Sequence, residues 1–257
     1  MTDREFDSAP DAIASAATVS LPLLPAPFVT VPGVRNLRDA GGTEGTGGLR
    51  PGRIYRSGSL HSLAPDGARL LGRLGLRTVV DLRSDAELDV YPDRRHGLDH
   101  ETLHLPTFPV DRESADQPWP DSQSGLYLYL PRYAGPSIAA TIRRLTTPGA
   151  LPALLHCAVG KDRTGLTVAV IQHLLGATDD EITAEFLLSN LGLGLHNGPS
   201  PYIDETGTER ISRPVTAALL QSSLTWIRDT HGSVEGYVVA AGVTAAELAA
   251  LRGLLGN

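Results

Sequence analysis

The chain has 257 residues, of which 41% are hydrophobic, with 27 glycines, 19 prolines and a formal net charge of −7. This length and composition predict an ordinary globular protein with a substantial core, and exclude a disordered or fibrous one. The negative charge argues against a general nucleic-acid surface, because binding to a phosphodiester backbone normally requires a basic face.

The N-terminal segment differs in composition from the rest. Residues 1–26 are rich in Ala, Pro and Ser, and residues 1–11 are acidic. A secretory signal needs a basic start before its apolar run, so we expect residues 1–26 to form a flexible tail rather than an export signal. We expect residues 27–257 to form a single domain. No run of eighteen apolar residues is present, and we expect no membrane-spanning helix.

The elements expected in the first half are short. Residues 28–59 carry apolar runs broken by glycines, which predicts a small β-rich entry to the domain. Residues 77–80 are typical of a buried strand, and helical patterns lie over 65–74, 85–90 and 130–145.

The second half is expected to be largely helical. A buried strand over 150–155 is followed by a helix over 164–175, and another helix is predicted over 214–230. Capping-box patterns, Thr178 with Glu181 and Thr244 with Glu247, predict helices over 179–188 and after residue 244. Residues 191–213 are rich in Gly, Pro and Ser and are expected to form a long loop.

Together these elements predict an α/β fold with a central, mostly parallel sheet flanked by helices and a helix-rich C-terminal half. Polar residues between the strands, among them Asp93, His96, His100 and His104, do not have the spacing of a helical metal site, and we expect no metal and no cofactor. Tyr127, Tyr129 and Tyr133 are expected to pack rather than to bind a ligand.

Residues 156–165 carry the strongest chemical signal. They read His-Cys-Ala-Val-Gly-Lys-Asp-Arg-Thr-Gly and place the single cysteine, Cys157, six positions before Arg163. The stretch lies between a predicted strand and a predicted helix, where loop amides and a helix N-terminus favour both an oxyanion and a thiolate. A loop of this length encloses one tetrahedral anion. The residues expected to hold phosphate are Ala158, Val159, Gly160, Lys161 and Thr164.

Each remaining side chain of the loop has a chemical use. A thiol with a pKa of ~8.5 is a poor nucleophile at neutral pH, but this environment lowers that value, so Cys157 is expected to attack as a thiolate. Arg163 offers a planar fork of donors for two phosphate oxygens. Thr164 can donate its hydroxyl to the sulfur and ease its departure. Gly160 and Gly165 are expected to permit an unusual backbone angle and close helix packing.

Roles for this cysteine outside a phosphatase loop fit the neighbouring residues less well. A buried structural cysteine has no use for Gly, Lys, Asp, Arg and Thr beside it. A rhodanese-like sulfurtransferase usually has a shorter loop without the arginine–threonine ending, and a low-molecular-weight arsenate reductase carries its loop near the N-terminus and needs more cysteines. With no resolving thiol to protect it from overoxidation, Cys157 suits a reducing cytoplasm, although export without a recognisable signal stays open.

Three further segments accompany the loop: residues 36–42 (Asn-Leu-Arg-Asp-Ala-Gly-Gly), 55–58 (Tyr-Arg-Ser-Gly) and 79–84 (Val-Val-Asp-Leu-Arg-Ser). With them the chain resembles the bacterial tyrosine phosphatase family typified by mycobacterial tyrosine phosphatase B, from about Val31 to the end. The resemblance implies a cysteine-phosphatase fold and phosphotyrosine activity, often with phosphoserine, phosphothreonine and phosphoinositide activity beside it, since the wide loop with Lys161 resembles that of lipid phosphatases. Its expected partners are phosphorylated proteins or phosphoinositides. No oligomeric state is predicted.

Three carboxylates compete for the role of general acid. The family pattern favours Asp162, inside the loop. Asp121 belongs to a Trp-Pro-Asp triplet like the movable acid loop of conventional tyrosine phosphatases, but it lies in a proline-rich polar stretch that produces such triplets by chance. Asp81 ends a predicted strand that faces the same cleft, so substrate positioning is its expected role. Geometry decides among them before any pKa does.

Several interpretations stay open at this point. Arg35, Arg38 and Arg56 either attract phosphate or brace loops by pairing with Asp39 or Asp81. Lys161 either meets additional phosphates on an inositol ring or pairs with Asp81. Residues 191–213 either leave the substrate entrance more open than the helical lid of the mycobacterial family or form a plain surface connection. The rival to an enzyme is a noncatalytic phosphate-recognition module.

Overall fold

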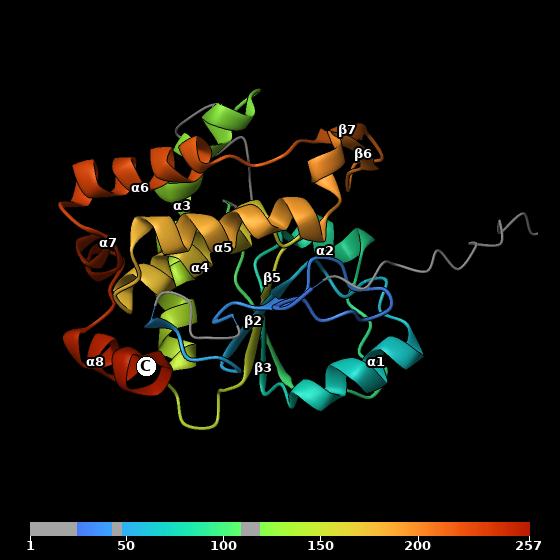
Figure 1. Cartoon of the computed structure of the whole chain (residues 1–257), viewed down its shortest axis with the longest axis horizontal. Coiled ribbons are helices and arrows are strands. Elements are labelled where there is room, and N and C mark those ends of the chain that lie inside the picture. The colour runs from blue at the N-terminus through green and yellow to red at the C-terminus, as the bar shows by residue number, and fades with distance from the viewer. Residues whose placement is uncertain (1–24, 43–47, 109–118) are drawn as a thin grey trace, which may run out of the picture.

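The computed structural model describes residues 25–42, 48–108 and 119–257. Its centre is a five-stranded sheet in the order β1-β2-β5-β3-β4, and all its neighbouring strands run parallel except the edge strand β1. The predicted fold class, a mostly parallel sheet flanked by helices, is therefore confirmed (Figure 1). The strands are β1 (Arg38–Asp39), β2 (Ile54–Ser57), β3 (Thr78–Asp81), β4 (Glu101–His104) and β5 (Ala153–His156).

Side chains of β3 and β5 point alternately to the two faces of the sheet and so contribute to two separate hydrophobic layers. Val79 and Leu154 are register partners that pack with α1 and the N-terminal loops. Val80 and Leu155, one position further, pack on the opposite face with the long helices. Successive side chains of a strand point to opposite faces, so four consecutive buried residues in each strand supply both cores.

Helices occupy both sides of the sheet (Figure 1). α1 and η2 lie on one side, and the helices of the C-terminal half pack together on the other. The helices are α1 (Pro65–Leu71), η2 (Gly72–Leu74), α2 (Asp85–Val90), α3 (Gln123–Leu145), α4 (Asp162–Leu174), α5 (Asp179–Gly192), η3 (Leu195–Asn197), α6 (Ala217–His231), α7 (Val234–Ala240) and α8 (Ala245–Leu255).

Two expectations about these elements were wrong. The segment 191–213 is not a plain loop: α5 extends to Gly192, and a hairpin of β6 (Ser200–Ile203) and β7 (Glu209–Ser212) follows. Asp204 makes this turn possible, because its carboxylate accepts hydrogen bonds from the backbone amides of Thr206 and Thr208. α3 begins seven residues before the predicted start, since the Ser122 hydroxyl caps it at the amide of Gly125.

The carboxyl ends of β2, β3 and β5 meet at one edge of the sheet, where Ser57, Asp81 and His156 are register partners. α2 and α4 both begin just beyond that edge. In a parallel sheet this edge is where ligands bind. No helix among the described residues is long and apolar enough to cross a membrane. The expected tail over 1–26 lies, up to residue 24, outside the described residues, and the single domain over 27–257 stays a prediction.

Candidate active site

The cysteine loop sits where the sequence places it. β5 ends at His156, Cys157 follows with 2% of its surface exposed, and α4 begins at Asp162 with Lys161 as its N-cap. The strand, loop and helix are therefore consecutive, and the first amides of α4 open toward the loop.

The carbonyls of Val159, Gly160 and Lys161 point away from the space that an anion would occupy. Asn36 donates its side-chain amide to the carbonyls of Val159, at 3.3 Å, and Gly160, at 3.0 Å. The Arg56 guanidinium donates to the carbonyls of Gly160, at 2.7 Å, and Lys161, at 3.3 Å. In a planar trans peptide the next N–H points opposite to the carbonyl. The N–H groups of Gly160, Lys161 and Asp162 consequently face inward, as a nest for an oxyanion requires.

Two glycines make this loop possible, as predicted. Gly160 has a φ of +69°, and a Cβ there would lie 2.2 Å from the Ser57 carbonyl oxygen. A Cβ on Gly165 would lie 2.8 Å from the Phe186 ring, so this glycine lets α4 approach α5. Position 160 therefore excludes any side chain. At position 165 a side chain fits only if the Phe186 ring moves.

The environment of Cys157 favours its thiolate. Burial alone raises the pKa of this thiol, but the positive charge of Arg163 and the interactions with the hydroxyl and backbone amide of Thr164 outweigh burial. The resulting pKa lies below the ordinary value of a cysteine. A thiolate is the nucleophilic form of cysteine, so the lowered pKa increases the fraction of Cys157 in that form.

Arg163 is held by a carboxylate from a different helix. The Glu87 carboxylate of α2 accepts hydrogen bonds from both terminal nitrogens of the guanidinium, at 2.5 and 2.7 Å. Glu87 also closes the capping box of α2 with Ser84. Burial raises the pKa of Glu87, but Arg163 and Ser84 reverse that effect and lower it to about 2. The pair therefore stays ionised at neutral pH, and it fixes the plane of the Arg163 guanidinium.

Replacing Glu87 with glutamine is expected to lower kcat on an aryl phosphate by about 10- to 100-fold, the equivalent of a lost charge-assisted pair of about 1.5–3 kcal/mol. The reason is that Arg163 keeps its charge but loses the partner that orients it. Asp85→Asn is the matched control, since Asp85 lies in the same helical turn and its side chain is 56% exposed. Steady-state kinetics decide the matter, and an unchanged kcat in Glu87→Gln would show that Arg163 is oriented without Glu87.

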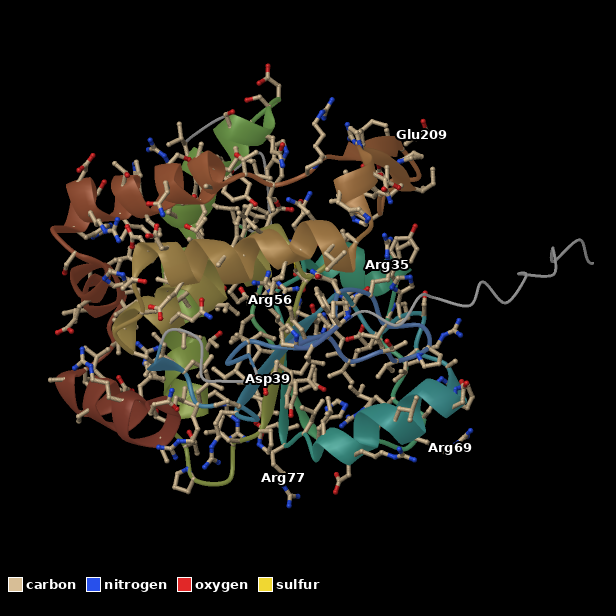
Figure 2. All side chains as sticks on the ribbon, in the orientation of Figure 1. Arg35, Asp39, Arg56, Arg69, Arg77 and Glu209 are labelled. Carbon is tan, nitrogen blue, oxygen red and sulfur yellow. The ribbon has the colours of Figure 1, made fainter. Side chains whose placement is uncertain are left out.

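A buried ion cluster supports the back of the loop. Arg38 and Arg56, both 0% exposed, bind the two carboxylate oxygens of Glu185 at 2.7 and 2.6 Å. Figure 2 shows Arg56 in the interior beneath α5. The expectation that these arginines brace loops is confirmed for this pair, but the predicted partners, Asp39 and Asp81, were wrong. Glu185 comes from α5 and reaches them across the fold.

Asp81 belongs to a second buried network. Its carboxylate accepts hydrogen bonds from the Arg83 backbone amide and guanidinium, and the side chain is 1% exposed. Burial raises the pKa of Asp81, but His156 and Arg83 lower it to about 2. The carboxylate is thus committed to protein partners, so substrate positioning, the role expected of it, has no support in its contacts.

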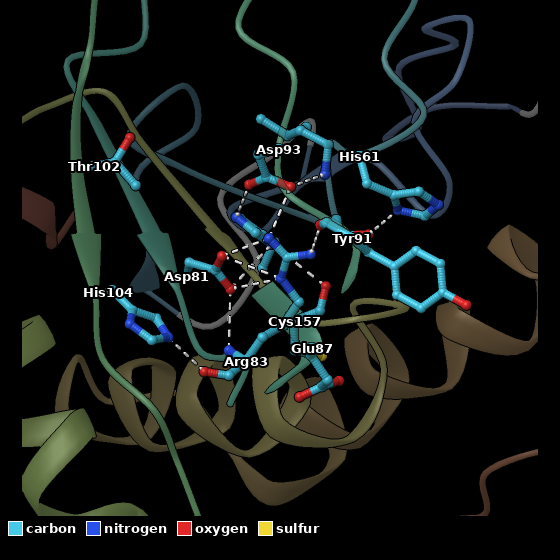
Figure 3. Close-up of polar contacts among 12 residues, drawn as sticks. His61, Asp81, Arg83, Glu87, Tyr91, Asp93, Thr102, His104 and Cys157 are labelled. Atoms are coloured by element: carbon cyan, nitrogen blue, oxygen red, sulfur yellow. Dashed lines mark hydrogen bonds and ion pairs between the residues drawn. The ribbon is translucent and has the colours of Figure 1, made fainter. Parts of the chain in front are cut away.

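Asp93, which lies beside Arg83 in Figure 3, completes this network together with His156. Arg83 lies 2.9 Å from Asp93, which lies 3.0 Å from His156. Burial lowers the pKa of His156, but Asp81 and Asp93 outweigh it and raise the pKa. Oxygen and nitrogen atoms of Asp81, Asp93 and His156 come within 4.8 Å of one another, a spacing that a metal ion could also use. Arg83 already supplies the positive charge at that point, so the donor set does not fit a further cation.

Asp162 and Asp121 differ in their surroundings. Asp162 opens α4, its side chain is 21% exposed, and the Tyr127 hydroxyl donates to its Oδ1 at 2.6 Å. Burial and the Asp162 charge raise the pKa of Tyr127, which therefore remains a donor. Asp121 is exposed and precedes the N-cap of α3. Its neighbour Trp119 packs on Phe108, at 4.8 Å between ring centroids.

Lys161 is nearly buried, and its ammonium does not pair with Asp81 as the sequence allowed. It donates to the Arg213 carbonyl at 2.8 Å and to the Ser212 hydroxyl at 3.3 Å, and it lies 3.8 Å from Asp162. The tyrosines behave as expected of packing residues, since Tyr127 and Tyr129 are 0% and 4% exposed. The hydroxyl of Tyr127 adds a contact to the site that sequence reasoning missed.

Glu87, Glu185 and Asn36 were also missed as site residues. Glu87 was visible only as the third position after Ser84, which signals a helix cap rather than an arginine partner. Asn36 has a φ of +59°, a backbone region that asparagine tolerates, and its position in the motif at 36–42 was the one available signal.

The chain is similar to known phosphatases. A family model described as tyrosine phosphatase family matches residues 29–256. The chain belongs to the tyrosine phosphatase family. It is accordingly a phosphoric monoester hydrolase of phosphotyrosine and related substrates.

Particular relatives match over most of their length. The triple specificity protein phosphatase PtpB of Mycobacterium tuberculosis is 30% identical, over 88% of this chain and 98% of the relative. A tyrosine-protein phosphatase of Nostoc commune is 26% identical, over 79% of this chain and 74% of the relative. The crystal structure of P. aeruginosa TpbA has a TM-score of 0.39 and 19% identity, and covers 74% of this chain and 86% of that chain.

Proposed function

We propose that the enzyme works through a phosphocysteine intermediate in which Cys157 is the nucleophile, Arg163 and the loop amides hold the phosphoryl group, and Asp162 is the general acid. The observation that carries this proposal is the loop itself: a thiol of lowered pKa lies beneath inward-facing amides, next to an arginine that Glu87 orients. The lowered pKa favours the thiolate that attacks, and the amides and Arg163 stabilise the negative charge of the phosphoryl oxygens.

The first step transfers the phosphoryl group to sulfur. The Cys157 thiolate attacks phosphorus in line with the leaving oxygen, the P–O bond breaks, and Asp162 donates its proton to that oxygen. The Tyr127 hydroxyl donates to Oδ1 of Asp162 and so orients the carboxyl group. Arg163 neutralises charge on two equatorial oxygens of the transferring group.

The second step releases phosphate. Asp162, now a carboxylate, takes a proton from water as the water oxygen attacks phosphorus, the P–S bond breaks, and the sulfur leaves as a thiolate. The same groups that lower the pKa of Cys157, namely Arg163 and Thr164, stabilise that leaving thiolate. Arg163 and Thr164 therefore stabilise the Cys157 thiolate both before it attacks and when it leaves.

The substrates we propose are phosphotyrosine-bearing proteins, with phosphate esters of serine, threonine and inositol as further candidates, in line with the name of the mycobacterial relative. We also propose a cytoplasmic location, because a lone low-pKa thiol is preserved in a reducing compartment. No metal or cofactor has a role in these steps.

Hydrolysis of para-nitrophenyl phosphate tests this function. The wild-type protein is expected to turn it over with competitive inhibition by vanadate, and Cys157→Ser to lose at least about 10³-fold in kcat, since a hydroxyl has no comparable anionic form. Acid quenching during turnover is expected to trap one phosphoryl group on Cys157, detected by peptide mass spectrometry.

The rival function predicts different results. A noncatalytic recognition module binds vanadate and phosphopeptides without turnover in the wild type. Full activity in Cys157→Ser, with a circular dichroism spectrum like that of the wild type, would also reject the phosphocysteine mechanism.

A further inference from the structure

The β6–β7 hairpin lies beside the phosphate loop and is attached to it at the base of β7. The Lys161 ammonium donates to the Ser212 hydroxyl and to the Arg213 carbonyl, and only 4% of Lys161 is exposed. These contacts join two segments about fifty residues apart in the chain. The loop lysine therefore points into the hairpin.

A second contact fixes the other end of the hairpin. The Tyr91 hydroxyl donates to the carbonyl of Asp204, the residue that starts the turn. Between the two attachments, Ser200, Tyr202 and Ser212 line a small groove together with Val159 of the loop and Arg35. The hairpin thus forms one wall of a groove beside the phosphate loop.

Tyr202 shows how near this wall lies to the reacting groups. Burial raises the pKa of Tyr202, the charge of Asp162 raises it further, and the charge of Arg163 opposes both. Tyr202 lines the same groove as Val159 of the phosphate loop, so the hairpin lies directly beside that loop.

Protein groups surround the ammonium of Lys161 in this arrangement and accept two of its donors. A lysine ammonium has three N–H donors. Ser212 and Arg213 accept two of them, and the third side of the ammonium faces Asp162 Oδ2 at 3.8 Å. The backbone N–H of Lys161 still faces the cradle, so the residue contributes to binding the first phosphate without using its charge.

We propose that the β6–β7 hairpin determines the substrate class by withholding the Lys161 ammonium from bound substrate. With the hairpin in place, the enzyme recognises the phosphate that it hydrolyses, and the Lys161 ammonium gives no charge-assisted contact to a second phosphate group. A phosphotyrosine peptide needs no such contact. An inositol phospholipid carries a second phosphate, which the Lys161 ammonium can contact only when Ser212 and Arg213 release it.

This inference rests on the proposed function, and a double-mutant cycle with two substrates tests it. The first change replaces residues 201–213 with three glycines; the ends are close, since Ser200 and Ser212 are register partners in the hairpin. The second change is Lys161→Met, made in the intact and in the shortened chain. The readout is the ratio of kcat/KM on a soluble short-chain phosphatidylinositol phosphate to kcat/KM on a phosphotyrosine peptide.

The shortened chain is expected to show a ratio at least about tenfold higher than that of the intact chain, the size of one charge-assisted hydrogen bond. Adding Lys161→Met to the shortened chain is expected to cancel that gain. In the intact chain Lys161→Met is expected to change both rates by the same factor. Ile211→Ser is the matched control, because Ile211 is 44% exposed on the same strand and makes none of the Lys161 contacts, so its ratio is expected to stay that of the intact chain.

Two results would overturn the inference. The first is a selective loss of lipid activity in Lys161→Met of the intact chain, which would mean that the ammonium already reaches the substrate. The second is an unchanged ratio in a shortened chain that still hydrolyses the peptide. Failure of the proposed function looks different, because the intact chain would then hydrolyse neither substrate.

Discussion

Replacing Glu185 with alanine is expected to lower the free energy of unfolding by about 3–5 kcal/mol, because it leaves two fully buried arginines without their shared carboxylate. Burial and the charge of Arg56 already lower the pKa of Arg38 to about 10, against the opposing effect of Glu185. Removing Glu185 takes away the one interaction in that set that favours the charged form. Urea unfolding followed by circular dichroism measures the change.

The same substitution is also expected to reduce activity. Arg56 holds the carbonyls of Gly160 and Lys161, so a displaced arginine loosens the loop whose amides bind phosphate. Glu235→Ala is the matched control: Glu235 pairs with Arg252 at 2.5 Å on the surface, where both side chains are about half exposed. Its effect on stability is expected to be far smaller. A loss below about 1 kcal/mol in Glu185→Ala would show that other groups compensate the two arginines.

The helices that sequence predicted best are those whose starts are fixed by neighbours in the chain. α2 has the predicted bounds, and α5 begins at the predicted Asp179, since Ser84 and Thr178 each close a capping box three residues ahead. The active-site loop was equally readable, because the residues that form its chemistry lie within ten consecutive positions. Local signals were sufficient there.

Local sequence signals do not identify the ion-pair partners of the buried charged residues. Arg38 and Arg56 were correctly expected to brace loops, but Glu185 lies 147 and 129 residues away from them in the chain. Nothing in the composition of α5 marks that glutamate as buried. Tyr127, which is 35 residues from Asp162, was likewise assigned to packing, and its ring does pack. Only the fold shows that its hydroxyl reaches the loop.

The hairpin was missed for a different reason. Residues 191–213 are rich in Gly, Pro and Ser, and such a composition indicates a loop when no tertiary contact is considered. The strands exist because Asp204 closes a turn and because Lys161 and Tyr91 tie both ends of the hairpin to the rest of the protein. An isolated two-stranded hairpin is marginal in water, so these attachments decide the structure.

Asp162→Asn is expected to reduce kcat by about 10²- to 10⁴-fold on an alkyl or unsubstituted phenyl phosphate and far less on para-nitrophenyl phosphate. The nitrophenolate leaves without a proton, whereas a poor leaving group needs one. Rates on a series of aryl phosphates with leaving groups of increasing pKa measure this effect as a steeper dependence on that pKa. The asparagine keeps the acceptor for Tyr127 and removes the proton.

Asp121→Asn in the same series separates the two leading candidates for the acid. Asp162 shares its helix turn with Arg163, and Tyr127 orients its carboxyl group, whereas Asp121 is exposed. A general acid has to reach the leaving oxygen in a fixed orientation, and among the described residues the contacts favour Asp162. A steeper dependence in Asp121→Asn, with Asp162→Asn unchanged, would instead assign the proton to the Trp-Pro-Asp triplet. In that case Phe108, which lies against both Arg163 and Trp119, would be the contact through which that triplet approaches the site.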